Sequence, residues 1–373
     1  MSTAITPFQV EIPQADLDDL RRRLAMTRWP EAETVADWSQ GVPLAWAQEL
    51  CEYWATGYDW RAAEARLNAV PQFRTEIDGL GIHFLHARSP HPDALPLLIT
   101  HGWPGSVVEF LDLIGTLTHP EDPADAFHVV CPSLPGYGFS DKPSGTGWTA
   151  ERTAAAWTEL MTRLGYHRYG AHGVDWGSFI TGILGETDTG RLAGIYLAMP
   201  FARPPQEQVE LSQRDLAGLA ALKEFQQTEG GYSVIQTTRP QTLAYGLTDS
   251  PAGQLAWMAE KYWSWSDHDG ELEKAISRDR LLDAVSVGWF AATAASSGRL
   301  YWESQNKMAL GQVDVPTGIS IFPKDGRMPR PWIERRFTDL RRWTDHEHGG
   351  HFPAMEQPEL LAGELRSFFR ELR

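Results

Sequence analysis

The stretch Tyr169-Gly-Ala-His-Gly173-Val-Asp175-Trp-Gly177 decides the fold. It predicts a strand that runs straight into a helix, and its last five residues match the G-x-nucleophile-x-G pattern of a nucleophile elbow. The two glycines of that pattern permit a tight turn and close packing of the strand on the helix, and the turn pushes the central side chain out at the end of a sheet. Because the five residues alone are as typical of a surface turn, the interpretation depends on their surroundings.

Asp175 stands at the centre of the pattern, where most elbows carry serine. A carboxylate is a poor partner for acyl transfer, but it can open a strained or activated sp3 carbon and form an alkyl ester. The aspartate therefore changes the predicted chemistry from acyl transfer to attack on carbon.

Strands and helices alternate on both sides of the elbow, which predicts βαβ units and a parallel sheet. The alternation lapses between about residues 201 and 310, where the pattern is mostly helical, and a helical insertion of this kind is the layout of a lid over a catalytic core. The predicted strands are 97–100, 127–131, 169–174, 317–322 and one near 342–344, and the predicted helices of the core include 107–117 and 149–164.

The N-terminal part reads differently from the core. Residues 1 to about 70 are rich in tryptophan and show helical spacing, and residues 73–84 predict two short strands around a turn at Asp78-Gly79. We therefore predict an α/β fold with a mostly parallel sheet flanked by helices. Its expected parts are an N-terminal helical meander (1–72), two parts of the core (73–200 and 311–373) and a helical lid (201–310).

A predicted oxyanion hole lies one strand-helix-strand unit before the elbow. His101-Gly-Trp103-Pro-Gly-Ser106 follows the strand 97–100 and opens a helix, where such enzymes place one oxyanion donor. The residue after the nucleophile supplies the second donor. The expected donors are the backbone N–H groups of Trp103 and Trp176.

Asp325 and His351 complete the expected constellation. Asp325 follows the strand 317–322, and His351 follows Gly349-Gly350 after the last predicted strand, 26 residues further on. The chain order nucleophile, acid, histidine is the one that this fold requires. His351 would take a proton from water, and Asp325 would hold its tautomer. Asp314 is a competing acid, but it precedes its strand and lies at the wrong end of the sheet.

A metal site is the rival interpretation of the histidines. His346, His348 and His351 have an H-x-H-x-x-H spacing that fits no zinc pattern. We therefore expect no metal and no cofactor.

Composition excludes several other classes. The net charge of −16 and the lack of a Lys/Arg-rich stripe argue against a nucleic-acid partner. The two cysteines form neither a disulfide framework nor a CxxC site. No apolar stretch approaches the roughly 20 residues that span a bilayer, and no basic n-region precedes an apolar core near Met1. We expect a soluble cytoplasmic protein without a membrane partner; the oligomeric state stays open.

Together these motifs resemble the microsomal-type epoxide hydrolase family, which includes juvenile-hormone and bacterial members and has the α/β-hydrolase fold. The resemblance covers nearly the whole chain. It rests on the N-terminal meander and on His101-Gly-Trp-Pro104, Gly173-Val-Asp-Trp-Gly177, Phe322-Pro-Lys-Asp325, Gly349-Gly-His-Phe352 and Glu356-Gln-Pro-Glu359-Leu-Leu361.

The resemblance implies two lid tyrosines that donate to the epoxide oxygen. Their segments look like Glu229-Gly-Gly-Tyr232-Ser-Val-Ile-Gln236 and Arg299-Leu-Tyr301-Trp-Glu303. Ring opening leaves an alkoxide that needs an acid, and a phenol is a suitable donor. Two features depart from the family. Vertebrate members carry an N-terminal membrane anchor, whereas this chain begins almost at the meander, so we do not expect a microsomal location. The acid Asp325 is Glu in some relatives.

The sequence therefore predicts an epoxide hydrolase that forms a vicinal diol through an alkyl-enzyme ester on Asp175. A haloalkane dehalogenase with the same nucleophile and a non-catalytic hydrolase-fold binding protein are the alternatives. Four lid tryptophans, Trp257, Trp263, Trp265 and Trp289, indicate either a bulky apolar or aromatic substrate or packing within the lid. Detoxification, catabolism of aromatic hydrocarbons and biosynthesis remain open as roles.

Overall fold

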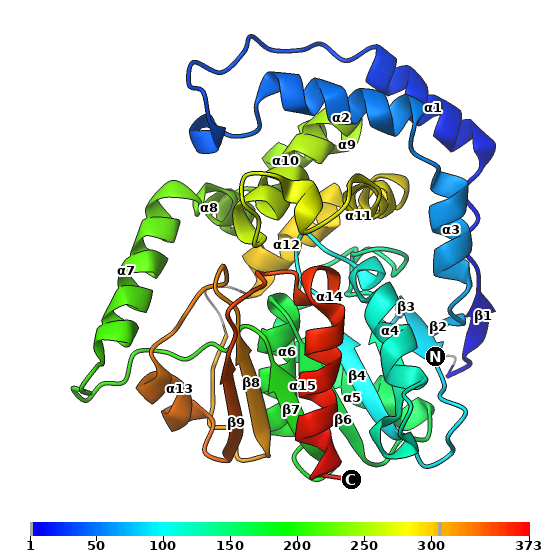
Figure 1. Ribbon diagram of the computed structural model, residues 1–373. Coiled ribbons are helices and arrows are strands. Elements are labelled where there is room, and N and C mark those ends of the chain that lie inside the picture. Colours follow the sequence, from blue (N-terminus) through cyan, green and yellow to red (C-terminus); the bar gives the residue numbers. More distant parts are fainter. Residues whose placement is uncertain (1–2, 305–307) are drawn as a thin grey trace.

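A mixed sheet organises the molecule (Figure 1). Within residues 3–304 and 308–373, which the computed structural model describes, nine strands pair in the order β1-β2-β3-β5-β4-β6-β7-β8-β9. The strands are β1 (Thr6–Phe8), β2 (Gln72–Ile77), β3 (Leu80–Ala87), β4 (Leu95–Thr100), β5 (Phe127–Pro132), β6 (Tyr169–Gly173), β7 (Leu192–Leu197), β8 (Thr317–Ile321) and β9 (Leu340–Asp345).

Six neighbouring strands of the sheet are parallel, as the alternation of strands and helices predicted: β5, β4, β6, β7, β8 and β9. The first three strands are antiparallel, and β3 joins the parallel part by pairing with β5. The turn between β2 and β3 lies at Asp78 and Gly79, whose φ angles are 51° and 77°. The carboxyl ends of the parallel strands meet at one edge of the sheet, where ligands bind in folds of this type.

One short strand corrects the prediction of a wholly helical N-terminal segment. β1 pairs with β2 through the register Thr6 to Arg74 and Phe8 to Gln72. Three residues are too few to show a strand period, and it is the pairing with β2, the otherwise open edge of the sheet, that makes this segment extended.

Helices cover both faces of the sheet. α4 and α15 pack against each other on one face, and α5 and α6 on the other (Figure 1). The predicted helix 107–117 is divided into the 3-10 helix η2 (Val107–Phe110) and α4. Thr149, the first residue of the predicted helix 149–164, is the N-cap of α5 and accepts a hydrogen bond from the Arg152 backbone N–H. The helices of the core are α4 (Leu111–Thr118), η3 (Pro123–Asp125), α5 (Ala150–Arg163), α6 (Trp176–Thr187), α13 (Arg330–Arg336), α14 (Pro353–Glu356) and α15 (Pro358–Arg370).

A group of helices lies between β7 and β8 in the chain. Most of them lie above the carboxyl edge of the sheet, and the first, α7, runs down beside the sheet at the left of the view (Figure 1). The group falls within the segment 201–310 that the sequence assigns to a lid; residues 305–307 of that segment lie outside the described part. These helices are α7 (Gln213–Thr228), α8 (Gly231–Thr238), α9 (Pro240–Asp249), α10 (Pro251–Trp265), η4 (Leu272–Lys274), α11 (Arg278–Phe290) and α12 (Ala294–Ser304).

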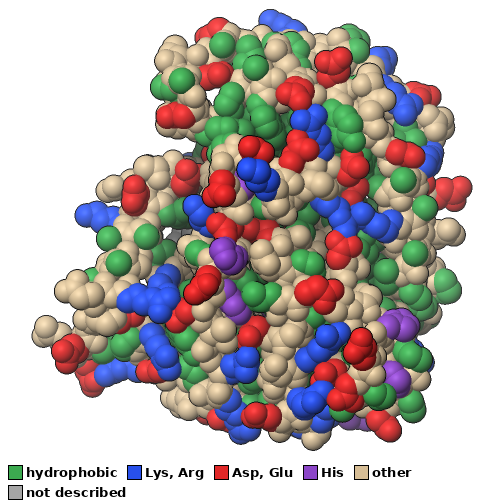
Figure 2. Space-filling model, viewed as in Figure 1, with side chains coloured by type: hydrophobic (Ala, Val, Ile, Leu, Met, Phe, Trp, Pro, Cys, Tyr) green, Lys and Arg blue, Asp and Glu red, His purple; other side chains and the backbone are tan. Residues whose placement is uncertain are grey.

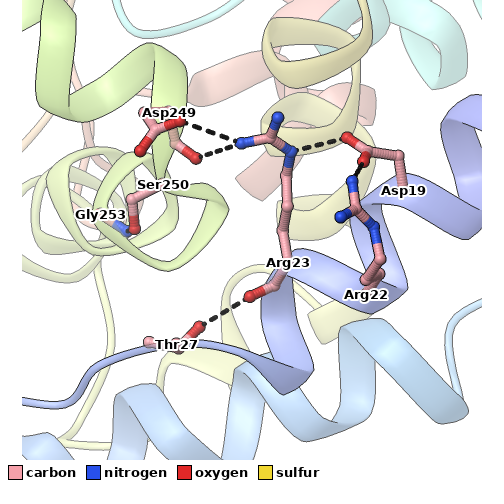
Figure 3. A network of polar contacts seen from close by, with 7 residues as sticks. All are labelled: Asp19, Arg22, Arg23, Thr27, Asp249, Ser250 and Gly253. Carbon is pink, nitrogen blue, oxygen red and sulfur yellow. Dashed lines mark hydrogen bonds and ion pairs between the residues drawn. The ribbon is translucent and has the colours of Figure 1, made fainter.

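The N-terminal helices lie across these lid helices. They are α1 (Gln14–Ala25), η1 (Trp38–Gln40), α2 (Leu44–Thr56) and α3 (Trp60–Asn68). Figure 3 shows Arg23 of α1 between its neighbour Asp19 and Asp249 at the end of α9, where it donates to the Asp249 carbonyl oxygen at 2.8 Å and to Oδ1 at 3.1 Å. Further contacts of this kind join Tyr53 to Asp279, Trp54 to Ser286 and the ring of Trp38 to that of Trp263.

The surface carries acidic and basic side chains intermixed over the face shown in Figure 2. No helix among the described residues has both the length and the apolar character needed to cross a bilayer.

Candidate active site

The elbow sequence makes the sharp turn that was predicted for it. Asp175 lies between β6 and α6 with φ 48° and ψ −125°, and it is 8% exposed. A side chain on Gly173 would collide with the Gly177 backbone, and one on Gly177 would collide with the carbonyl of Thr100. The close approach of α6 to β6 and β4 therefore requires glycine at both positions.

The loop after β4 reaches the same carboxylate. The backbone N–H of Trp103 donates to Oδ1 of Asp175 at 2.7 Å. Gly102 makes this approach possible, because a Cβ there would overlap the Asp175 carboxylate. Trp176 is the first residue of α6, so its N–H has no acceptor within the helix and lies at the positive end of the helix dipole. Both predicted oxyanion donors thus flank Asp175, and within the described residues the Trp103 amide is the one that already bonds it.

His351 lies between the predicted nucleophile Asp175 and the predicted acid Asp325. Its Nδ1–H donates to Oδ1 of Asp325 at 2.9 Å, and its Nε2 is 3.5 Å from Oδ2 of Asp175. Asp175 and His351 are buried, and the side chain of Asp325 is 8% exposed. The backbone N–H of His351 donates to the carbonyl of Trp265 at the end of α10, and the two rings meet edge to face at 4.9 Å. The arrangement gives one imidazole a partner on each ring nitrogen.

Electrostatics favour the protonated imidazole in this state. Burial alone would lower the pKa of His351, but the carboxylates of Asp325 and Asp175 outweigh it and hold the pKa well above its usual value. Removal of either negative charge would shift the balance toward the neutral ring.

The two lid tyrosines reach the same space from different helices. Tyr232 belongs to α8 and Tyr301 to α12, and their rings meet edge to face with centroids 5.9 Å apart. Trp103 stacks on Tyr232 at 4.9 Å, and Trp176 lies edge to face with Tyr301 at 5.0 Å. Burial, helped by the negative charge of Asp175, raises the pKa of both hydroxyls. Both therefore stay protonated and can donate.

The competing residues do not join the group. Asp314 is exposed and accepts from the Thr338 hydroxyl before β8. His346 bonds Ser320 at 2.8 Å, while His348 is largely exposed. Within residues 3–304 and 308–373, no group of three or more His, Cys, Asp or Glu side chains is arranged so that it could hold a metal ion.

Two buried charged residues beside the site were missed from the sequence. Lys261 of α10 is 2% exposed, and its Nζ lies 4.8 Å from the centroid of the Tyr232 ring and 2.9 Å from Oε1 of Glu260. Glu109 of η2 is 5% exposed. The only signal in the sequence is a single charge within a mostly apolar run for Glu109, and the adjacent charges Glu260 and Lys261 within such a run for Lys261. Such charges usually lie on a solvated face.

A third missed feature connects the His351 loop to the end of α10. Oδ2 of Asp267 accepts from the Gly349 N–H at 2.9 Å. The Glu356 carboxylate accepts from the N–H groups of Asp267 and Phe352 at 2.7 and 2.9 Å. These bonds fix the loop that carries His351 to the lid.

Comparison with known proteins identifies the family of this site. The family described as "Epoxide hydrolase N terminus" matches residues 5–110, and the family "alpha/beta hydrolase fold" matches residues 96–230. A protein of Stigmatella aurantiaca, provisionally named an epoxide hydrolase, is 53% identical over 99% of this chain and 86% of its own. Epoxide hydrolase 1 of Sus scrofa is 33% identical over 98% of this chain and 88% of its own.

The chain belongs to the epoxide hydrolase family.

A solved structure of an epoxide hydrolase agrees with this one over its full length. The juvenile hormone epoxide hydrolase of Bombyx mori has a TM-score of 0.93 at 30% identity, covering 100% of this chain and 95% of the other. The epoxide hydrolase of Aspergillus niger has a TM-score of 0.90 at 34% identity, covering 99% and 97%. The predicted family, fold class and enzyme class are thereby confirmed, and the haloalkane dehalogenase and binding-protein alternatives are set aside.

Proposed function

We propose that the chain hydrolyses an epoxide to a vicinal diol through an ester on Asp175. His351 is the base, oriented by Asp325, and the Tyr232 and Tyr301 hydroxyls donate to the epoxide oxygen. The amides of Trp103 and Trp176 hold the oxyanion. The observation that carries this proposal is that the two oxygens of the Asp175 carboxylate have different neighbours. Oδ1 accepts a hydrogen bond from the Trp103 amide, and Oδ2 lies 3.5 Å from Nε2 of His351. A general base for direct attack by water would not need an oxyanion donor on its own carboxylate.

In the first step Oδ2 of Asp175 attacks a ring carbon, the carbon–oxygen bond of the ring breaks, and the oxygen takes a proton from the tyrosine pair. Asp175 becomes a neutral ester, so His351 loses one of the two negative charges that raise its pKa. His351 can then return a proton to the tyrosinate. The imidazole is left neutral, as a base must be.

In the second step His351 takes a proton from water, and the hydroxide adds to the ester carbonyl carbon. The oxyanion that forms is held by the amides of Trp103 and Trp176. Collapse of this intermediate breaks the bond to the alkyl oxygen, and the departing alkoxide takes the proton of the new carboxyl group. Diol, ionised Asp175 and protonated His351 result, which restores the starting state without a cofactor.

We also propose an apolar or aromatic substrate. Half-buried aromatic rings continue outward from the proposed catalytic group: Phe179 packs on Trp176 at 5.4 Å, and Phe201 packs on Phe179 at 5.1 Å. On the lid side Trp257 lies edge to face with Trp103 at 6.4 Å. Sites lined in this way favour ligands with large apolar surfaces. A cytoplasmic location stays a prediction.

A single turnover in 18O-labelled water tests the covalent route. With enzyme in excess, the oxygen added to the substrate comes from Asp175, so the first diol is largely unlabelled and the label enters the aspartate. Labelled diol from the first turnover together with an unlabelled Asp175 would refute the proposal. The position of the label is read by mass spectrometry of the diol and of the peptide that contains Asp175.

A further inference from the structure

Two buried polar groups beside His351 have no function in the mechanism described above. Glu109 of η2 is 5% exposed and its Oε1 has no hydrogen-bond partner within the described residues. Tyr262 of α10 is fully buried. Among the described residues, no group makes a hydrogen bond of good geometry with its hydroxyl. Buried polar atoms of this kind are rare in native proteins.

The two groups lie close to each other and, through the Tyr262 ring, to the loop that carries the proposed base. The Tyr262 hydroxyl lies close enough to the Glu109 carboxyl to shift its pKa, and the charges of His351 and Asp175 act on the same carboxyl. The ring of Tyr262 stacks at 4.2 Å on Phe352, the residue after His351. Trp265, one turn further along α10, packs against the His351 ring. Glu109 and Tyr262 therefore adjoin the loop that presents the imidazole.

The position of Glu109 is fixed by the loop that carries the Trp103 amide. A Cβ on Gly105 would overlap the Glu109 carboxyl, so this side chain occupies the space that a larger residue at position 105 would fill. Burial raises the pKa of Glu109 to about 8, while the charge of His351 acts in the opposite direction. Near neutral pH the group is mainly a carboxylic acid, which can both donate and accept a hydrogen bond.

We propose that Glu109 and Tyr262 bind the water molecule that His351 deprotonates in the second step. Buried water typically makes two to four hydrogen bonds to polar groups that would otherwise lack a partner. A carboxylic acid, a phenol and the imidazole supply such a set. The step is balanced as before: one proton of the water goes to Nε2 of His351, and its oxygen forms the bond to the ester carbonyl carbon of Asp175. Glu109 and Tyr262 are positioning residues that orient the water.

This inference rests on the proposed covalent route. A role in orienting water and a purely structural role predict different effects on the two half-reactions. Loss of an oriented water slows hydrolysis of the ester and leaves its formation unchanged. Loss of local structure also displaces the neighbouring Trp103 loop, and it would therefore slow both steps.

The experiment measures both rates in single turnovers, by rapid quench and intact-mass analysis of the ester, in three variants. Glu109→Leu removes the polar group at similar size, Glu109→Gln keeps a polar group, and Tyr262→Phe removes only the hydroxyl and keeps the stack on Phe352. We expect Glu109→Leu and Tyr262→Phe to slow ester hydrolysis about 10- to 100-fold, the effect of one lost hydrogen bond to a reacting group. Ester formation should stay within about 2-fold, and Glu109→Gln should recover most of the loss.

Equal slowing of both steps, or hydrolysis at the wild-type rate in Tyr262→Phe, would overturn the inference. Tyr262→Phe decides the question if Glu109→Leu does not fold. Failure of the wild-type enzyme to form any ester would instead overturn the proposed function, so the two failures are distinguishable.

Discussion

Nε2 of His351 lies 3.5 Å from Oδ2 of Asp175, so the proposed base and the proposed nucleophile are electrostatically coupled before any substrate binds. The carboxylate of Asp175 is one of the charges that keep the imidazole protonated. The basicity of His351 therefore depends on the chemical state of Asp175, and the ester itself produces the base that removes it.

We expect the substitution Asp175→Asn to lower the pKa of His351. The amide has nearly the shape of the carboxylate but lacks its charge. Burial still lowers the pKa of His351, and only Asp325 remains to raise it. Titration of the His351 ring by NMR, with labelled histidine, measures the change. His351→Gln assigns the His351 signal by difference, and His348→Gln, which removes an exposed ring, is the control. An unchanged pKa would show that Asp325 alone sets it.

The substitution His351→Gln should trap the intermediate. Ester formation needs the carboxylate and the tyrosines, whereas ester hydrolysis needs the base. The protein should therefore gain the mass of one substrate molecule and keep it through long incubation. Asp175→Asn under the same conditions should gain no mass. A His351→Gln protein that remains unmodified with a good substrate would contradict this division of the two steps.

The tyrosines should act together in ring opening. Either Tyr232→Phe or Tyr301→Phe removes one donor, which would cost about 2.7–4 kcal/mol, or about 10²- to 10³-fold in the rate of ester formation, if it behaves like an oxyanion-hole donor. The double variant should be far slower than either. The matched control is Tyr58→Phe, which changes a tyrosine of the N-terminal part whose hydroxyl donates to Asp283 of α11. Wild-type rates of ester formation in the double variant would contradict the assignment.

The substitution Glu109→Gln should change how stability depends on pH. The folded pKa of Glu109 is about 8 against an ordinary value of 4.5. Between these values the folded protein binds more protons than the unfolded chain, so Glu109 makes the free energy of unfolding fall as pH rises. Glutamine does not titrate. The difference in Tm, variant minus wild type, should therefore become more positive between pH 5 and pH 8. A constant difference would mean that Glu109 is ionised throughout.

The parts of the structure that depend on local pattern were predictable from the sequence. The elbow around Asp175 and the loop at Trp103 are short motifs that can be recognised in the sequence by their glycines. The parallel strands are apolar runs that alternate with helices. The strand β1 was not predictable, because three residues have no period and pairing with β2 decides their conformation.

Glu109 and Lys261 show the other limit of prediction. Each is a charged residue in a helix, and its burial results from packing against other segments: Lys261 lies over the ring of Tyr232 in α8. The environment of Glu109 comes from Tyr262 and His351, far along the chain. The spacing of residues in the sequence does not predict such tertiary contacts. The order of Asp175, Asp325 and His351, in contrast, follows from the order of the strands.

The hydrogen bonds between the His351 loop and the end of α10 have a consequence for substrates that are too large. Trp265, Asp267 and Glu356 join that loop to the lid, so a bulky group that displaces α10 also displaces His351. Asp175 and the Trp103 amide belong to the sheet side, and Tyr301 belongs to α12, so the nucleophile and one donor to the epoxide oxygen are not carried along with α10. An oversized epoxide could then still alkylate the enzyme, but the adduct would not be hydrolysed. Such compounds would act as irreversible inactivators, and the size at which turnover changes to inactivation would measure the room beneath the lid.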